Sequence, residues 1–305
     1  MAGGPTAVLL LFISFLSACA PTLRLPGPPS DQPTLEKGNF TTSDGVRLPL
    51  HVWAPEQPPK AVLLALHGFN DYGSFIKKAG AFLAGQSVRV YAYDQRGFGR
   101  APHRGIWAGW RAYGDDLTAL TKLLRARHPG LPLFLLGSSM GGAVIMTAMT
   151  RPETPKVDGI ILAAPAVWGR ATMPFYQRWA LWLSAHTVPW FTLTGEGLNI
   201  KASDNLEMLR ALGRDPLIIK HTRVDTIWGL VNLMDKALAA APHLRGSALI
   251  LVAGKDEVIT AGPTGRMLAT LSPAQKANQK IIHYGGGFHM LLRDLKAQRV
   301  WQDVL

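Results

Sequence analysis

Six short runs of continuous apolar residues constrain the fold of this chain more than any other feature. They are bounded by turn-forming residues and occupy Ala61–Leu66, Val88–Tyr93, Leu133–Leu136, Gly159–Ala163, Ala248–Ala253 and Lys280–His283. Continuous rather than alternating apolarity is typical of strands buried on both faces of a parallel sheet. Helical stretches separate several runs, notably Tyr113–Arg127 and Met140–Thr150. The alternation predicts an α/β fold with a mainly parallel central sheet flanked by helices.

An antiparallel hairpin is expected before the first of these runs. Phe40–Thr42 and Leu48–Ala54 are short strand-like segments on either side of Asp44-Gly45, a dipeptide that favours tight turns. The folded domain is therefore expected to begin near residue 36 and to continue to residue 305.

The rhythm of strands is interrupted between about residues 166 and 238, where we expect a helical cap inserted into the domain. Within this segment Phe175, Trp179 and Trp182 recur at i, i+4 and i+7, which places them on one helical face. Such a stripe is consistent with ordinary core packing or with the wall of a pocket for an apolar substrate. Its position beside the catalytic motif described below favours the acyl pocket.

Composition excludes several classes of protein. At 48% hydrophobic and 17% charged residues the chain is neither disordered nor fibrous. Its 32 Lys and Arg against 20 Asp and Glu give a formal net charge of +12. These basic residues are scattered and no nucleic-acid-binding motif accompanies them, so a generally basic surface is expected and nucleic acid is not an expected partner.

The N-terminal residues have the features of a targeting signal. Ala7–Leu16 is apolar and too short to span a bilayer, which needs about 20 residues, but its length suits the apolar core of a signal peptide. The following Leu16-Ser17-Ala18-Cys19 resembles the lipobox of bacterial lipoproteins. It departs from the usual signal pattern in having no Lys or Arg before the apolar run.

The lipobox resemblance implies that residues 1–18 are a signal peptide and that the thiol of Cys19 is lipidated. Residues 19–35 are rich in proline and are expected to be a semi-rigid tether between this anchor and the domain. The chain would then be lipid-anchored in a bacterial cell envelope. Ala20, which is not aspartate, implies the outer membrane rather than the inner one.

A G-x-S-x-G motif at residues 137–141 lies between an apolar strand and a helix that starts near Met140. This is the context of a nucleophile elbow, in which a sharp turn exposes the central serine at the edge of a sheet. Ser139 is therefore the candidate nucleophile, and Ser138 is not because it lacks the symmetrical glycines. The Met140 N–H at the helix start is a candidate oxyanion donor.

A nucleophilic serine needs a base and an acid that orients the base, and in this type of fold the acid precedes the histidine. Asp256 follows the strand Ala248–Ala253, and Glu257 beside it is the alternative. His289 follows the last strand in a glycine-rich loop, so it is the candidate base, whereas His283 lies within the strand. No H-E-x-x-H spacing suggests a metal, and no cofactor is expected.

The second oxyanion donor is expected from the loop after an early strand. Ala61–Leu66 leads into His67-Gly68-Phe69, and the N–H of Phe69 is the natural candidate.

Taken together, these segments resemble a serine hydrolase of the α/β-hydrolase superfamily, and more narrowly the monoacylglycerol lipase and lysophospholipase branch, sometimes grouped with serine aminopeptidases. The segments that carry the resemblance are HGFN at 67–70, YDQRGFG at 93–99, GSSMGG at 137–142, GKD at 254–256 and HMLL at 289–292. The resemblance implies hydrolysis of a lipid ester through an acyl-enzyme on Ser139, with Asp256 orienting His289.

Other activities remain open. The same three residues could serve a small-ester esterase or a peptidase acting at an amino terminus, which would need a carboxylate such as Glu196 or Glu207 for the substrate ammonium. A non-catalytic surface lipoprotein is the alternative from another class. An aspartate-nucleophile reaction is not expected because a serine occupies the elbow. The sequence does not indicate an oligomeric state.

Overall fold

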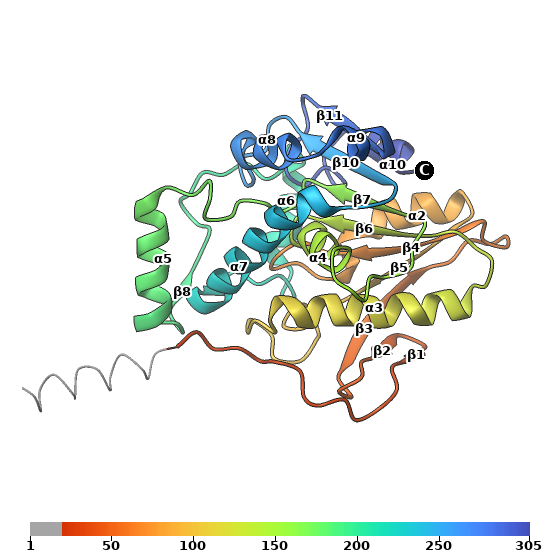
Figure 1. The fold of residues 1–305 in the computed structure, drawn as a ribbon, viewed down its shortest axis with the longest axis horizontal. Helices are drawn as coiled ribbons and strands as arrows, with labels where there is room; N and C mark the ends of the chain where they lie inside the picture. Colours follow the sequence, from red (N-terminus) through yellow and green to blue (C-terminus); the bar gives the residue numbers. More distant parts are fainter. Residues whose placement is uncertain (1–19) are drawn as a thin grey trace, which may run out of the picture.

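The computed structural model describes residues 20–305 and builds them around a nine-stranded sheet of order β1-β2-β3-β5-β4-β6-β7-β10-β11 (Figure 1). The strands are β1 (Thr34–Glu36), β2 (Asn39–Thr41), β3 (Arg47–Trp53), β4 (Ala61–Leu66), β5 (Val88–Tyr93), β6 (Leu133–Ser138), β7 (Gly159–Ala163), β10 (Ala248–Ala253) and β11 (Gln279–Tyr284). From β5 to β11 neighbouring strands are parallel, whereas β1, β2 and β3 form an antiparallel edge that joins β5. The predicted α/β fold with a mainly parallel sheet is confirmed.

The six apolar runs fall within β4, β5, β6, β7, β10 and β11. The first five of these strands are buried on both faces of the sheet, whereas β11 lies at its edge with Lys280 and His283 exposed, so the expected burial is wrong for this last strand. Strand β4 illustrates the cause. Val62, Leu64 and Leu66 belong to one hydrophobic core, whereas Leu63 and Ala65 belong to a second core on the opposite face. A strand buried in this way has no polar face, so its sequence is continuously apolar.

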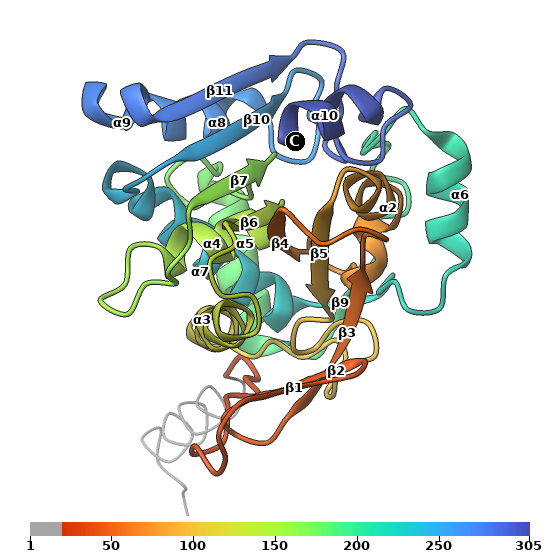
Figure 2. The same cartoon turned by 90° about the vertical axis from the view of Figure 1, so that its right-hand side faces the viewer.

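Helices cover both faces of the sheet (Figure 2). Helices α3, α4 and α7 contribute to one core, and α2 and α10 to the other. The helices are α2 (Lys77–Gly85), α3 (Trp110–Arg127), α4 (Met140–Ala148), α5 (Phe175–Thr187), α6 (Leu206–Arg214), α7 (Val224–Ala240), α8 (Ala261–Ala269), α9 (Pro273–Asn278) and α10 (Ala297–Val304), with 3-10 turns at Gly73–Ile76 and Ala241–His243.

The segment between β7 and β10 contains helices α5, α6 and α7 and a two-stranded ribbon of β8 (Thr192–Leu193) and β9 (Thr222–Arg223). Helix α7 packs on α4, and α5 packs on α7 as the outermost helix at one end of the molecule (Figure 1). We call residues 166–238 the cap.

Both hydrophobic cores are built from residues between 35 and 304. The segment 20–305 therefore contains a complete core and is a folding unit in its own right. Within this segment, no helix combines the length and the apolarity needed to cross a membrane.

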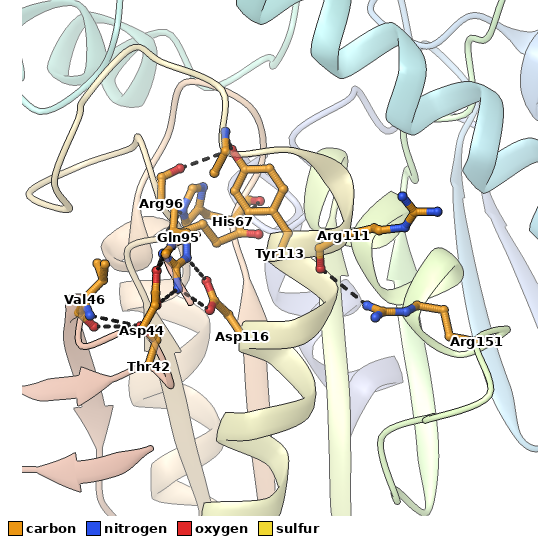
Figure 3. Close-up of polar contacts among 12 residues, drawn as sticks. Thr42, Asp44, Val46, His67, Gln95, Arg96, Arg111, Tyr113, Asp116 and Arg151 are labelled. Carbon is orange, nitrogen blue, oxygen red and sulfur yellow. Dashed lines mark hydrogen bonds and ion pairs between the residues drawn. The ribbon is translucent and has the colours of Figure 1, made fainter. Parts of the chain in front are cut away.

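A buried ion-pair cluster joins the β2–β3 turn, the loop after β5 and helix α3 (Figure 3). Arg96 donates to Asp116 at 2.7 and 2.9 Å and to Asp44 at 2.8 and 2.6 Å. The side chains of all three residues are less than one-tenth exposed. Two desolvated carboxylates thus share one guanidinium, which fixes the loop after β5 to the sheet.

Substituting Arg96→Met is expected to lower the free energy of unfolding by about 3–5 kcal/mol, because it leaves two buried carboxylates facing each other without a cation. Burial raises the pKa of Asp116 to about 6, and without Arg96 its charged form is disfavoured further. The loss of stability should therefore be smaller at pH 5 than at pH 8, as measured by urea unfolding.

Arg151→Met is the matched control for this experiment. Arg151 pairs with Asp115 at 2.5 Å, but both side chains are partly exposed. Removing this solvated pair is expected to cost less than about 1 kcal/mol. Equal losses for the two variants would show that the Arg96 cluster contributes no more than a surface pair.

Candidate active site

Ser139 lies at the junction of β6 and α4, in the sharp turn that its motif predicts. Its backbone has φ 51° and ψ −115°, a conformation that residues other than glycine rarely adopt. The turn is held from both sides, because the Ser139 N–H donates to the Ala163 carbonyl at 3.0 Å and the Ala166 N–H donates to the Ser139 carbonyl at 3.0 Å. Strain of this kind persists only where surrounding structure fixes it, as at reactive sites.

The two motif glycines are required by close backbone approach. A Cβ atom added to Gly137 would lie 2.4 Å from the backbone of Gly141 and Gly142, and one added to Gly141 would lie 2.3 Å from the Leu66 carbonyl oxygen. No real Cβ contact is that short with backbone atoms that cannot move aside. The glycines therefore let helix α4 start directly against β4 and β6, with Ser139 at the bend.

Asp256 and His289 form a hydrogen-bonded pair although 33 residues separate them in the chain. His289 Nδ1 lies 2.8 Å from Asp256 Oδ2, and both side chains are less than one-tenth exposed. The other carboxylate oxygen, Oδ1, accepts the N–H groups of Val258 at 2.9 Å and Ile259 at 2.8 Å. An aspartate held in this way accepts from Nδ1–H, which leaves Nε2 of His289 unprotonated and able to take a proton.

The two alternative residues, Glu257 for the acid and His283 for the base, differ from Asp256 and His289 in exposure and in contacts. Glu257 is exposed, and its Oε2 accepts the N–H of Lys201 in the cap at 2.7 Å. His283 lies within β11 and is exposed. Neither residue contributes to the Asp256–His289 pair.

The loop after β4 borders Ser139. A Cβ atom added to Gly68 would lie 3.4 Å from the Cβ of Ser139, so this backbone passes directly over the serine. His67 holds the loop in place, since its Nε2 accepts the Gln95 N–H at 3.0 Å and the Gln95 side chain donates to the His67 carbonyl at 3.0 Å. Phe69 follows, with its ring packed edge-on against Phe98 at a centroid distance of 5.7 Å.

An ion pair that the sequence does not signal joins this same loop to the segment that carries His289. Arg293 donates to the Asp71 carboxylate, and the Asp71 N–H donates to the Gly68 carbonyl at 3.3 Å. The loop 68–71 is thus in contact with Ser139 on one side and with the His289 segment on the other. The loop is therefore a link between the Ser139 turn and the His289 segment, whereas within residues 20–305 the side chains of Ser139 and His289 are not joined by a direct hydrogen bond.

A second unpredicted contact holds the backbone beside His289. Asp294 accepts the N–H of Phe288 at 2.8 Å and the hydroxyl of Ser203 at 2.6 Å, and both Asp294 and Ser203 are buried. Burial raises the pKa of Asp294 above its ordinary value. The Ser203–Asp294 contact joins residues 91 apart in the sequence, so no local motif could have identified it.

Both candidate oxyanion donors border Ser139. Met140 is the first residue of α4 and is completely buried. Phe69 directly follows Gly68. Backbone N–H groups at a helix start and in an adjoining loop are suited to stabilise negative charge on a carbonyl oxygen.

The three aromatic residues predicted to line an acyl pocket lie on the outward side of α5. Phe175 is 68% exposed, Trp179 67% and Trp182 46%. The acyl-pocket assignment stays a prediction for these residues, and their exposure is the basis of a different inference below. Cys19, the predicted lipidation site, lies outside the described residues.

The burial of His67 predicts a pH dependence of stability. Desolvation lowers the pKa of this completely buried imidazole below its ordinary value of 6.5. The unfolded chain therefore binds a proton that the folded chain does not. The contribution of neutral His67 to the free energy of unfolding is complete above pH 6.5 and is lost as the pH falls towards the pKa of His67 in the folded chain.

Urea unfolding of wild type and His67→Gln at pH 7.5 and 5.5 measures this effect. The variant keeps one acceptor and one donor but does not titrate, so it should lose less stability than wild type between the two pH values. His243→Gln, at an exposed histidine, is the control and should behave as wild type. Identical pH responses of wild type and His67→Gln would contradict the assignment.

Comparison with known families and proteins identifies the chain as a hydrolase. Residues 57–296 match the family model described as serine aminopeptidase, S33, a hydrolase family. The chain is 26% identical over 272 residues to human monoglyceride lipase, covering 88% of each chain. It is 24% identical over 277 residues to monoacylglycerol lipase of Mycolicibacterium smegmatis, covering 89% of this chain and 96% of the relative.

Solved structures of the same fold include a soluble variant of monoglyceride lipase from Saccharomyces cerevisiae. It superposes with a TM-score of 0.72 at 19% identity and covers 93% of this chain and 96% of that chain. At this identity the likeness shows the fold, which is that of the α/β-hydrolases.

Proposed function

The chain belongs to the serine aminopeptidase S33 family of serine hydrolases, and on this basis we propose that it hydrolyses lipid esters of the monoacylglycerol or lysophospholipid class with Ser139 as nucleophile. The observation that carries the proposal is the buried Asp256–His289 hydrogen bond of 2.8 Å, at the sheet edge where the strained Ser139 turn also lies. The similarity to monoglyceride lipases along 88–89% of the chain supports the substrate class.

In the proposed mechanism, Nε2 of His289 takes the proton of the Ser139 hydroxyl as Oγ attacks the ester carbonyl carbon. The N–H groups of Phe69 and Met140 stabilise the oxyanion of the tetrahedral intermediate. The imidazolium, oriented by Asp256, returns the proton to the leaving alcohol as the ester bond breaks. Water then attacks the acyl-enzyme with His289 as base and releases the fatty acid.

The ester assignment is favoured over the peptidase alternative by the cap. Glu196 and Glu207, the carboxylates that would bind a substrate ammonium, are both exposed on the cap surface. An exposed carboxylate in water gives little discrimination for an amino group.

A membrane location is also proposed. The lipobox at residues 16–19 supports a lipid anchor on Cys19 in a bacterial cell envelope, with Ala20 favouring the outer membrane. Such an anchor would place a lipid-ester hydrolase where its substrate resides.

Substrate class is tested with residues 20–305 on three kinds of substrate: a monoacylglycerol, a series of p-nitrophenyl esters from butyrate to laurate, and an amino-acid p-nitroanilide. We expect turnover of the monoacylglycerol, with kcat/KM for p-nitrophenyl esters rising as the acyl chain lengthens, because each added methylene that is buried contributes about 0.8 kcal/mol. Turnover of the anilide alone would establish the peptidase. Turnover of short esters alone would contradict the lipid assignment.

A further inference from the structure

The outer side of the cap carries an unusual density of exposed large apolar side chains. Helix α5 contributes Phe175, Tyr176, Trp179, Trp182 and Leu183, and the chain directly after it contributes Trp190 and Phe191, the last two each 56% exposed. We call these seven residues the aromatic face. Soluble domains rarely leave so many large apolar side chains in one place unless they meet another surface.

The aromatic face adjoins a cationic hollow. A cavity of about 370 Å³ is lined by Trp179, Trp182 and Trp228 together with Arg170 and Arg178. Arg170 lies over the Trp228 ring at 4.2 Å and is neutralised by Asp235. Arg178 is exposed, and among residues 20–305 it has no ion-pair partner.

Charge and shape together indicate what this surface meets. Helix α5 contains no acidic residue, and the whole chain carries a net charge of +12. Tryptophan and arginine side by side suit the interfacial region of a bilayer, where indole rings lie at headgroup level and the guanidinium binds phosphate. A second protein copy would bring an equally basic face against this one.

The start of the described chain is held beside the aromatic face. Thr22 donates its N–H to the buried Asp225 carboxylate at 3.2 Å, and Arg223 donates to the Thr22 hydroxyl at 3.3 Å. The Asp225 N–H in turn donates to the carbonyl of Pro189 at 3.0 Å, one residue before Trp190. The chain therefore reaches residue 20 next to β8 and the lower end of α5 (Figure 1).

Further contacts fasten the following residues to the domain, so that residues 20–31, here called the strap, run along its surface. Arg24 N–H donates to the Trp107 carbonyl at 2.8 Å, and Gly27 N–H donates to Asp44 at 3.1 Å. Ser30 N–H donates to the Ser43 carbonyl at 2.8 Å. A chain fastened at four places does not let its first residue move freely around the domain.

We propose that the aromatic face binds the surface of a lipid bilayer containing anionic headgroups, with Arg178 as a headgroup contact, and that the strap holds the Cys19 anchor on this same side. The strap part of the proposal rests on the proposed lipid anchor. Binding of the face itself does not depend on ester hydrolysis. Anchor and face then attach to one bilayer, which fixes how the domain lies on it.

The test measures binding of unanchored residues 20–305 to vesicles by flotation. Phosphatidylcholine vesicles with and without phosphatidylglycerol are compared, and we expect binding that is stronger with the anionic lipid. Trp179→Ser with Trp182→Ser should weaken binding by about tenfold, because two large interfacial side chains are lost. Arg178→Gln should lower binding to the anionic vesicles by about fivefold and leave binding to phosphatidylcholine unchanged.

The matched control is Leu295→Ser with Leu305→Ser, which removes two exposed apolar side chains outside the cap. It should bind as wild type. Loss of binding in this control as large as in the tryptophan variant, or wild-type binding by the tryptophan variant, would overturn the proposal. Absence of vesicle binding, with a dimer in sedimentation that the tryptophan changes dissociate, would assign the face to a second copy.

A second variant keeps the proposal testable if the serine changes unfold the cap. Replacing Trp179, Trp182 and Trp190 of the aromatic face with phenylalanine keeps the surface apolar, so binding should persist, but quenching of tryptophan fluorescence by brominated acyl chains should fall. Unchanged quenching would place other tryptophans in the bilayer and contradict the proposal. Hydrolysis of p-nitrophenyl butyrate in solution, measured on the same variants, distinguishes a loss of catalytic activity from a loss of vesicle binding.

The strap is tested by amide hydrogen exchange of residues 20–305 in solution. The amides of Thr22, Arg24, Gly27 and Ser30 should exchange more slowly than that of Lys37, because each donates to the domain. If all four amides exchange as fast as those of an unstructured peptide, the strap does not hold the anchor beside the aromatic face, and this part of the proposal is wrong.

Discussion

Replacing Ser139 with alanine should lower kcat for a monoacylglycerol by about 10⁴- to 10⁶-fold while leaving the fold intact. The hydroxyl is the proposed nucleophile, so its removal leaves only a bound substrate and an oxyanion site. The backbone of the turn is held by the Ala163 and Ala166 hydrogen bonds, to which the hydroxyl does not contribute. Kinetics and urea unfolding of the same preparation separate chemistry from stability.

Ser138→Ala is the control for this substitution. Ser138 is the last residue of β6, adjacent to Ser139 and equally a serine, but its place in the strand gives it no strained turn. We expect activity close to wild type. Activity that survives Ser139→Ala and disappears in Ser138→Ala would reverse the assignment of the nucleophile.

Asp256→Asn should lower kcat by about 10⁴-fold. The aspartate serves two sets of donors at once: Oδ2 accepts from His289, and Oδ1 accepts from the N–H groups of Val258 and Ile259. An asparagine can satisfy only one of the two sets with its oxygen. Turning the oxygen towards the backbone N–H groups presents an NH₂ to His289, which then holds its proton on Nε2 and cannot act as base.

Glu257→Gln provides the comparison, because this neighbouring carboxylate is exposed and contacts the cap through Lys201. Its kcat is expected to stay within about threefold of wild type, as for a surface polar contact. Measuring the pH dependence of kcat/KM for both variants adds a readout, since only loss of the residue that orients His289 should change the acidic limb, on which a general base stops working. Equal losses in the two variants would indicate disruption of the loop instead.

The sheet was predictable because burial on both faces makes the central parallel strands continuously apolar. The runs at Val88–Tyr93, Gly159–Ala163 and Ala248–Ala253 coincide with β5, β7 and β10. The turn at Ser139 was equally readable, since the clashes of a Cβ at Gly137 or Gly141 leave glycine as the residue that fits. These features depend on interactions that are local or that repeat along one strand.

The features that the sequence did not indicate depend on contacts between distant segments. Asp71 and Arg293 are 222 residues apart, and Ser203 and Asp294 are 91 apart, so each pair depends on the assembled fold. For the same reason the sequence does not show which side chains of α5 are exposed. The period of Phe175, Trp179 and Trp182 defines a helical face, but only the packing of α5 on α7 determines which side of the helix faces outward.

The most direct test of the account is to trap the acyl-enzyme. The wild-type protein, mixed with p-nitrophenyl laurate and quenched in acid, should gain the mass of one lauroyl group on the peptide that contains residues 137–142. Ser138→Ala should gain the same mass, whereas Ser139→Ala should gain none. An acyl group on another residue would contradict the proposed mechanism. So would hydrolysis of the ester with neither a Ser139-dependent adduct in the quenched enzyme nor a Ser139-dependent initial burst of p-nitrophenol.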